Sequence, residues 1–297
     1  MKTIDIKNAS PLAQQSVLQY AIAPRPICFA STVDAEGNVN LSPFSFFNMF
    51  SVNPAICVFS PSRSVRTNKI KHTLENLREV PEVVINIVNY AMVQQVSLAS
   101  TEYPKDINEF IKVGFTEATS SLVRPPRVLE APVQLECKVK EIIEVAETPG
   151  SGNLVIAEVL LAHVSEEILD TNGKIDQAKI DLVARLGGNW YARITKDALF
   201  EVAKPLSTLG IGVDALPQQI RLSRVLNGNH LGQLGNVEKL PDINELKDEI
   251  VSEEIENTLS RYSDYKQEQT RQLHLLAAKY LDKNEVAKAW QALLYCN

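Results

Sequence analysis

Two long extended segments joined by a short turn place the strongest constraint on how this chain can fold. Residues 133–145 (VQLECKVKEIIEV) alternate apolar and polar side chains with a period of two, as a half-buried strand does. Pro149, Gly150 and Gly152 supply turn residues, and residues 153–163 (NLVIAEVLLAH) form a second extended run. Strands joined by a short turn pair antiparallel, so the sequence predicts an antiparallel sheet.

Shorter segments extend this pattern toward the N-terminus. Runs of β-branched and aromatic residues predict further strands at residues 27–33, 39–41, 55–60 and 83–88. Helical spacing and capping residues predict helices at residues 11–20, 67–79 and 91–100. Strands outnumber helices, and neither a GxGxxG nor a GxxxxGK[ST] motif is present, which disfavours a doubly wound nucleotide-binding fold. We expect a closed antiparallel barrel with flanking helices, because closure removes exposed sheet edges.

The character of the sequence changes after about Lys204. Residues 205–240 are rich in glycine and proline and show little periodic hydrophobicity, which predicts a long ordered connection or small irregular structure. From Asp242 onward, apolar residues share helical faces: Ile243, Leu246 and Ile250, then Leu273, Leu276, Ala277 and Tyr280, then Val286, Ala289, Trp290 and Leu293. We therefore predict a barrel domain at residues 1–204, followed by the connection and a helical extension at residues 205–297.

Composition excludes several classes of function. The 297 residues carry 30 Lys and Arg against 36 Asp and Glu, and this net charge of −6 disfavours nucleic acid or an anionic membrane as partner. No apolar run reaches the roughly 18–20 residues that cross a bilayer, and the N-terminus lacks the apolar core of a signal peptide. The cysteines, Cys28, Cys57, Cys137 and Cys296, form no CxxC pair. We predict buried thiols, no bound metal and a cytoplasmic location.

Two polar segments offer the groups of a ligand site. Residues 60–68 (SPSRSVRTN) gather serines, arginines and a threonine before the helix expected from about Thr67, where hydroxyls, guanidinium groups and the helix dipole favour a phosphate. Residues 40–48 (NLSPFSFFN) offer amides and hydroxyls for the edge of a planar heterocycle, and phenylalanines as flat walls. Each segment also has a structural explanation, as a solvated loop and as an aromatic strand-to-loop corner.

The order of these motifs resembles the flavin reductase-like, FMN-binding split-barrel family, which includes flavoredoxin. The resemblance rests on Pro24-Arg25-Pro26, Ser31-Thr32, Gly37, residues 40–48, Pro54, residues 60–68, Asn86, residues 124–128 and residues 185–191. It covers about residues 15–195. The resemblance implies a mainly β fold, a Greek-key antiparallel split barrel with flanking helices, with the helical C-terminal extension outside the match.

The resemblance also implies a cofactor site for FMN. The residues that would line the isoalloxazine ring, partly through backbone amides, are Asn40, Leu41, Ser42, Phe44, Ser45 and Asn48. Those that would hold the phosphate are Ser60, Ser62, Arg63 and Thr67. Family members are typically homodimers with the flavin near the subunit interface. No catalytic side chain is implied, because the cofactor carries the chemistry.

One departure from the family leaves the reaction open. Many flavin reductases of this fold carry a histidine before the strand that ends in Gly-Glu-Val, and this chain has Asn153 there. The first hypothesis is an NAD(P)H-dependent flavin reductase that passes electrons to an unknown acceptor, such as a protein. The second is a flavoredoxin-like FMN electron carrier without a nicotinamide site. The third is a barrel scaffold whose helical tail is an interaction module.

Overall fold

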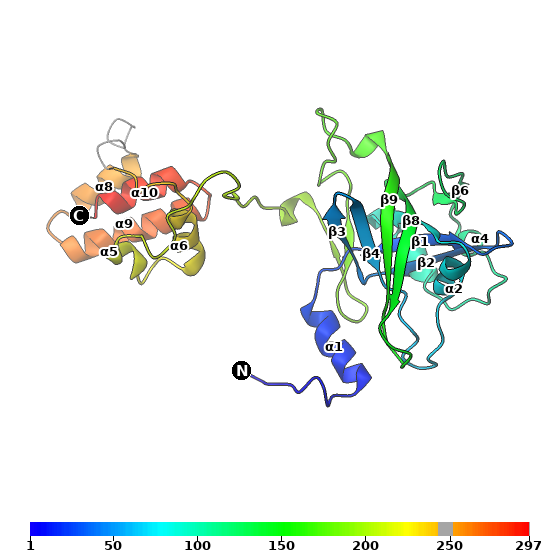
Figure 1. The fold of residues 1–297 in the computed structure, drawn as a ribbon. Helices are drawn as coiled ribbons and strands as arrows, with labels where there is room; N and C mark the ends of the chain where they lie inside the picture. Colours follow the sequence, from blue (N-terminus) through cyan, green and yellow to red (C-terminus); the bar gives the residue numbers. More distant parts are fainter. Residues whose placement is uncertain (243–251, 297) are drawn as a thin grey trace. The chain divides into compact units, whose positions relative to one another are not determined.

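The computed structural model describes residues 1–242 and 252–296. Contacts along the chain divide it into two compact units, Met1–Phe200 and Glu201–Asn297 (Figure 1). The first unit holds the sheet, and the second is helical. In the described residues, every helix is too short or too polar to cross a membrane.

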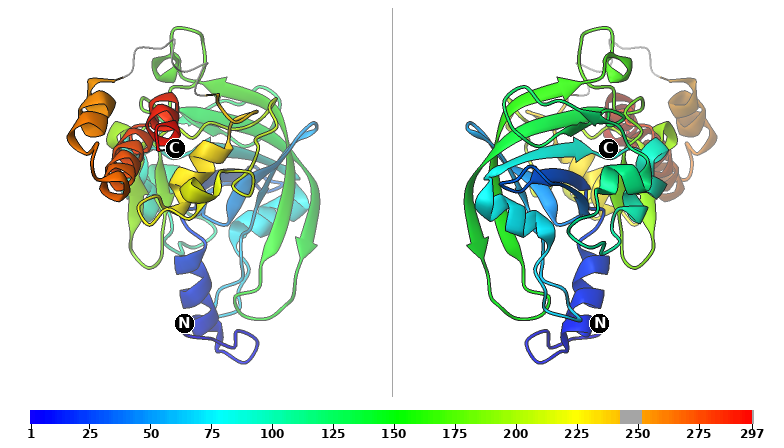
Figure 2. Two further views of the ribbon diagram at one scale, coloured as in Figure 1. Left: turned by 90° about the vertical axis from the view of Figure 1, so that its left-hand side faces the viewer. Right: turned by 90° about the vertical axis from the view of Figure 1, so that its right-hand side faces the viewer.

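The first unit is built on a seven-stranded sheet in the order β2-β1-β5-β8-β9-β4-β3, and every pairing is antiparallel. The strands are β1 (Cys28–Val33), β2 (Val39–Phe44), β3 (Phe47–Val52), β4 (Ala55–Phe59), β5 (Glu82–Ile87), β8 (Val133–Glu144) and β9 (Asn153–Val164). Figure 2 shows them curving around a common interior. The predicted hairpin is confirmed, since β8 and β9 pair from Val133 opposite Val164 to Glu144 opposite Asn153.

The barrel is split rather than closed. Strands β2 and β3 follow each other in the chain, yet they lie at opposite ends of the sheet order and no ladder among the described residues joins them. Pro43 has no N–H to offer a further strand, which suits an edge position on β2. The expectation of full closure is therefore wrong, and the chain turns the corner between the two edges at Ser45 and Phe46.

Four α-helices belong to the first unit. They are α1 (Pro11–Ala21), α2 (His72–Glu79), α3 (Val93–Leu98) and α4 (Glu109–Val113). The first begins as predicted, because the Ser10 hydroxyl accepts a hydrogen bond from the Ala13 amide at 3.3 Å. The predicted start of α2 near Thr67 is wrong. Asn68 adopts φ 57°, a left-handed conformation that interrupts a right-handed helix, and α2 begins only at His72.

Strand β1 is buried on both faces. Along β1, Phe29 packs into a cluster with residues of α3 and α4, whereas Cys28 and Ala30 pack into the barrel interior with β4, β5, β8 and β9. This alternation is the two-residue period of a strand. Cys57 and Cys137 lie in the same interior cluster, so the prediction of buried thiols is confirmed for these positions.

The second unit has an apolar core of its own. Its described helices are α5 (Gln218–Arg221), α6 (Gly228–Gly235), α8 (Glu253–Arg261), α9 (Lys266–Leu281) and α10 (Val286–Leu294). The predicted faces of α9 and α10 are confirmed, because Leu273, Ala277 and Trp290 are buried together. Ile243, Leu246 and Ile250 lie outside the described residues.

The expectation of irregular structure at residues 205–240 is partly wrong. Helices α5 and α6 fall within this range, and Ile220 and Leu234 from them enter the core of the second unit. Both helices are short, and so few turns leave little hydrophobic periodicity to detect. Asn227 starts α6 with a side-chain cap: its Oδ1 accepts a hydrogen bond from the His230 amide at 3.0 Å.

Candidate functional site

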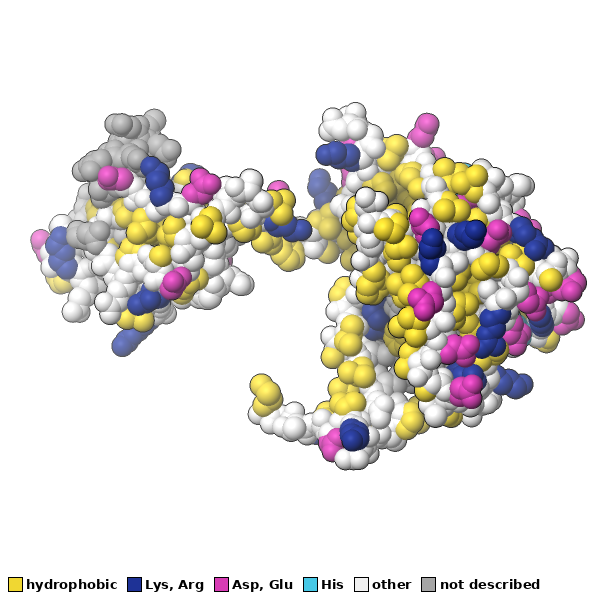
Figure 3. Space-filling model, viewed as in Figure 1, with side chains coloured by type: hydrophobic (Ala, Val, Ile, Leu, Met, Phe, Trp, Pro, Cys, Tyr) yellow, Lys and Arg dark blue, Asp and Glu magenta, His cyan; other side chains and the backbone are white. Residues whose placement is uncertain are grey.

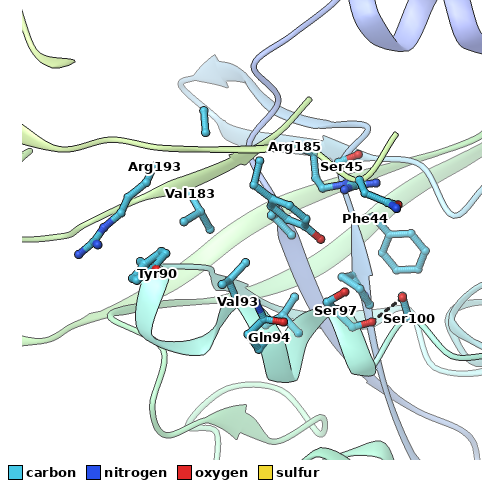
Figure 4. Close-up of a pocket in the computed structure, with 16 residues that line it drawn as sticks. Phe44, Ser45, Tyr90, Val93, Gln94, Ser97, Ser100, Val183, Arg185 and Arg193 are labelled. Carbon is cyan, nitrogen blue, oxygen red and sulfur yellow. Dashed lines mark hydrogen bonds between the residues drawn. The ribbon is translucent and has the colours of Figure 1, made fainter. Parts of the chain in front are cut away.

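A cavity of about 610 Å³ opens where β2 ends at the split of the barrel. Pro43, Phe44 and Ser45 form one part of its wall, next to the short strands β10 (Val183–Arg185) and β11 (Tyr191–Arg193). Helix α3 lies across the cavity from Ser45 (Figure 4). The volume lies in the range of small-molecule sites, which is about 300–1,000 Å³.

Two of the residues predicted for the flavin ring, Phe44 and Ser45, line this cavity, and Ser42 precedes them on β2. Ser42 and Ser45 are partly exposed, and Phe44 packs against Phe59 with ring centroids 5.6 Å apart. Asn48 is exposed on β3, the next strand along the chain, where its Oδ1 accepts a hydrogen bond from the Met49 amide at 2.8 Å. The end of β2 therefore offers the cavity one hydroxyl, from Ser45, and one aromatic ring, from Phe44.

Two residues predicted to line the ring, Asn40 and Leu41, are instead buried and hydrogen-bonded within the protein. Asn40 is buried, and its Nδ2 donates to the Thr73 hydroxyl of α2 at 2.9 Å. Leu41 is fully buried, and its amide donates to Oε2 of Glu109 at 3.0 Å. Burial raises the pKa of Glu109, and the hydrogen bond from Leu41 opposes this shift. Asn40 and Leu41 thus anchor β2 to the helices behind it.

The residues predicted for the phosphate lie in the loop that follows β4. The hydroxyl oxygens of Ser60 and Ser62 are 3.3 Å apart. Arg63 donates from Nη1 to the Asn68 carbonyl at 3.3 Å and lies 3.9 Å from Glu144. Thr67 is exposed at the rim of the loop. The helix dipole does not reach these groups, because α2 begins at His72, so the loop could offer an anion only its own hydroxyls, amides and guanidinium groups.

The turn between β8 and β9 holds this loop in place. The Arg63 amide donates to the Ser151 carbonyl at 2.9 Å. The backbone amide of Asn153 donates to the Ser60 hydroxyl at 3.1 Å, and its side-chain Nδ2 donates to the Pro61 carbonyl at 2.8 Å. Asn153 is fully buried, so at this position the chain has a loop anchor rather than a side chain that points to solvent.

The donor set of the loop fits a phosphate monoester such as that of FMN. Nε of Arg63 is buried and has no hydrogen-bond partner among the described residues. A buried unpaired donor is costly, and a guanidinium donor gains most from an anionic acceptor. In the described residues, no group of three or more His, Cys, Asp or Glu side chains could hold a metal ion.

Arg185 lines the cavity and Arg25 lies next to it, with Nε 3.4 Å from the hydroxyl of the cavity residue Ser45, and sequence reasoning assigned neither a role. Arg25 is buried and donates to the carbonyls of Gln19 at 2.6 Å, Ile22 at 2.7 Å and Leu186 at 2.8 Å. Arg185 lines the cavity and stacks on Tyr191, with its guanidinium carbon 4.5 Å from the ring centroid. The only signal in the sequence was their place in two motifs of the resemblance.

The strand order, the split at Ser45 and the hydroxyl-arginine loop define a class of protein, the split-barrel flavoproteins. A sequence model described as "Flavin reductase like domain" matches residues 20–179, and the chain belongs to this family. The fold class and the family expected from the sequence are thereby confirmed. The family supports a flavin-related oxidoreductase role for the chain.

Comparisons with individual proteins agree with this assignment. An uncharacterized protein of Aquifex aeolicus is 34% identical over 172 residues, which is 58% of this chain and 85% of the relative. The crystal structure of nitrilotriacetate monooxygenase component B from Bacillus cereus is similar at 27% identity and TM-score 0.63, covering 68% of this chain and 98% of that one. Flavoredoxin of Desulfovibrio vulgaris shares the fold, with 22% identity and TM-score 0.53 over 62% of this chain and 92% of that one.

Proposed function

We propose that the chain binds FMN at the split of the barrel and acts as an NAD(P)H-dependent flavin reductase or oxidoreductase. The observation that carries the proposal is the loop of Ser60, Ser62 and Arg63, whose buried Nε lacks a partner among the described residues. The bound flavin would supply hydride acceptance and electron transfer, while the protein supplies binding and orientation. An unknown small molecule or protein would accept the electrons.

The chain's own residues divide the binding task between two segments. Ser42 and Ser45 present hydroxyls and Phe44 an apolar wall to the ring, with Asn48 on β3, the next strand along the chain. Ser60, Ser62 and Arg63 hold the phosphate, and Thr67 closes the rim of that loop. Asn40 and Leu41 act behind the site as positioning residues, because their side chains fix β2 against α2 and the core.

A second candidate function is an FMN electron carrier without a nicotinamide site. One observation favours it: Asn153 stands where many flavin reductases carry a histidine, and here its side chain is buried against Pro61. A buried amide in that place offers no imidazole ring to a nicotinamide. The carrier would accept electrons from a protein donor.

Exposed apolar side chains on β3 support a homodimer. Met49, Phe50 and Val52 expose 62%, 69% and 79% of their surface on an edge strand. Figure 3 shows hydrophobic side chains over β3 and β4 on this face of the first unit. Large exposed apolar patches on edge strands are sites of association. Analytical ultracentrifugation should give twice the 33.0 kDa chain mass. The helical second unit is a further candidate for partner binding.

Anaerobic mixing of the FMN-loaded chain with NADH or NADPH distinguishes the two functions. The reductase predicts that either or both nicotinamides bleach the flavin absorbance, and dithionite provides the fully reduced control. Bleaching by dithionite alone would contradict the reductase and support the carrier. A chain that retains no FMN would contradict both functions.

A further inference from the structure

Two arginines without a carboxylate partner among the described residues lie beside the corner at Phe44 and Ser45, which we call the flavin corner. Arg25 and Arg185 face each other across an isolated β-bridge, with backbone N–H to O distances of 3.0 and 2.8 Å. Neither forms an ion pair with a carboxylate within the described ranges 1–242 and 252–296. Burial, and then the charge of Arg185, lower the pKa of Arg25, so the two charges repel each other.

The two arginines differ in what they can offer a ligand. Arg25 is buried and donates hydrogen bonds to three backbone carbonyls, and its Nε lies 3.4 Å from the Ser45 hydroxyl. Arg185 is partly exposed and lines the cavity, and its one protein acceptor among the described residues is the Gly188 carbonyl at 2.9 Å. Arg185 therefore has free donors that face a cavity.

Arg193, on the same wall, provides an internal comparison. It stacks on Tyr90 at 3.7 Å from the ring centroid, much as Arg185 stacks on Tyr191. Its guanidinium, however, is paired with both carboxylate oxygens of Asp181, at 2.8 and 2.9 Å. The charge of Arg193 is already compensated, whereas that of Arg185 is not.

The remaining walls fit a flat organic molecule. Helix α3 contributes Val93 and Val96 as apolar groups, and Gln94 and Ser97 as polar groups. Figure 4 shows Gln94 and Ser97 on the wall opposite Ser45 and Arg185. A cavity with aromatic and aliphatic walls, a few polar groups and one uncompensated cation selects a planar anion.

We infer that Arg185 is the anion-binding group of a second subsite, which takes the carboxylate or phosphate of a ring-bearing organic anion. The inference rests on the proposed function, because Phe44 and Ser45 belong both to this cavity and to the flavin corner. The ring lies between Tyr191 and the apolar residues of α3, and the anion is held by the free donors of the Arg185 guanidinium. Two sources share this chemistry, an aromatic carboxylate and a reduced nicotinamide nucleotide.

Calorimetric titration of the full chain tests the inference, with and without FMN and in buffer free of chloride. The probes are benzoate, its neutral isostere benzamide, and reduced nicotinamide mononucleotide. We expect at least one of the two anions to bind. If benzoate is the ligand, benzamide should bind far more weakly than benzoate. Arg185→Gln should lower the affinity for the anion about tenfold to hundredfold. Arg193→Gln should bind the same anion as the wild type does. The anion affinity of Arg185→Lys should lie between those of the wild type and Arg185→Gln, because lysine keeps the charge but lacks the planar guanidinium that stacks on Tyr191.

Each contrary outcome has a distinct meaning. If neither anion binds, or if Arg185→Gln and Arg193→Gln behave alike, the inference is wrong. If Arg185→Gln loses FMN affinity and keeps anion affinity, the charge serves the flavin instead, and the inference is again overturned. The titrations without FMN report on the subsite even if the chain proves unable to bind flavin, so the two proposals fail separately. Circular dichroism of Arg185→Gln verifies that the variant is folded.

Discussion

Replacing Arg63 with glutamine should weaken FMN binding while leaving riboflavin binding unchanged. Riboflavin lacks the phosphate, so the comparison isolates the contact between that group and the guanidinium. Arg63 has only 14% of its side chain exposed, and its nearest carboxylate, Glu144, is 3.9 Å away. Glu144 forms its closer ion pair with Arg78. The charge of Arg63 is therefore available to a ligand.

The size of the effect follows from the kind of bond that is lost. A hydrogen bond to a charged group contributes about 1.5–3 kcal/mol, which corresponds to a decrease in FMN affinity of roughly 10- to 150-fold. Glutamine keeps part of the side chain's length and can still donate to the Asn68 carbonyl, so the loop should keep its shape. Fluorescence titration of FMN and of riboflavin against the same protein preparations measures both affinities.

Arg78→Gln is the matched control, because Arg78 contacts the same carboxylate from the exposed side. It should leave FMN affinity close to that of the wild type. Equal loss of FMN and riboflavin affinity in Arg63→Gln would show that Arg63 only supports the loop. Unchanged FMN affinity would place the phosphate elsewhere and refute the reasoning from the unpaired Nε.

Three further predictions concern the scaffold. Phe59→Ala, which empties a fully buried position in the barrel interior, should lower the free energy of unfolding by about 3–5 kcal/mol in urea titrations. Burial raises the pKa of Glu136, but hydrogen bonds from two backbone amides and from His163 outweigh it and bring the pKa below its usual value. The stability that Glu136 contributes is therefore present at neutral pH and lost as pH falls through this lowered pKa, and Glu136→Gln should flatten the acid arm of a urea-midpoint profile. Removal of residues 201–297 should leave FMN affinity in fluorescence titrations unchanged, because the first unit holds every proposed cofactor contact.

Much of the fold could be predicted because its signals are local. The alternation in β8 and β9 and the turn between them lie within about thirty residues, and they correctly indicated an antiparallel sheet. The start of α2 was missed because one residue, Asn68, takes a left-handed conformation that polar spacing does not reveal. The residue pattern alone predicted a closed barrel, because closure depends on a pairing between β2 and β3 that the pattern does not reveal, whereas the resemblance correctly implied the split.

The site was harder to predict because it depends on contacts between distant segments. The serines and Arg63 are neighbours in sequence, so the phosphate loop could be proposed from one motif. The bridge between Arg25 and Arg185 joins residues that are 160 positions apart, and no pattern in either segment predicts this pairing. Asn153 is similar: its anchoring of Ser60 depends on a turn that packs against a loop 93 positions earlier.

Titration of the full chain with FMN, followed by flavin fluorescence, tests the central claim most directly. We expect saturation at one FMN per chain, with riboflavin binding roughly tenfold or more weakly because it lacks the phosphate that Ser60, Ser62 and Arg63 would hold. Absence of saturable binding, or equal affinities for FMN and riboflavin, would contradict the account of this site.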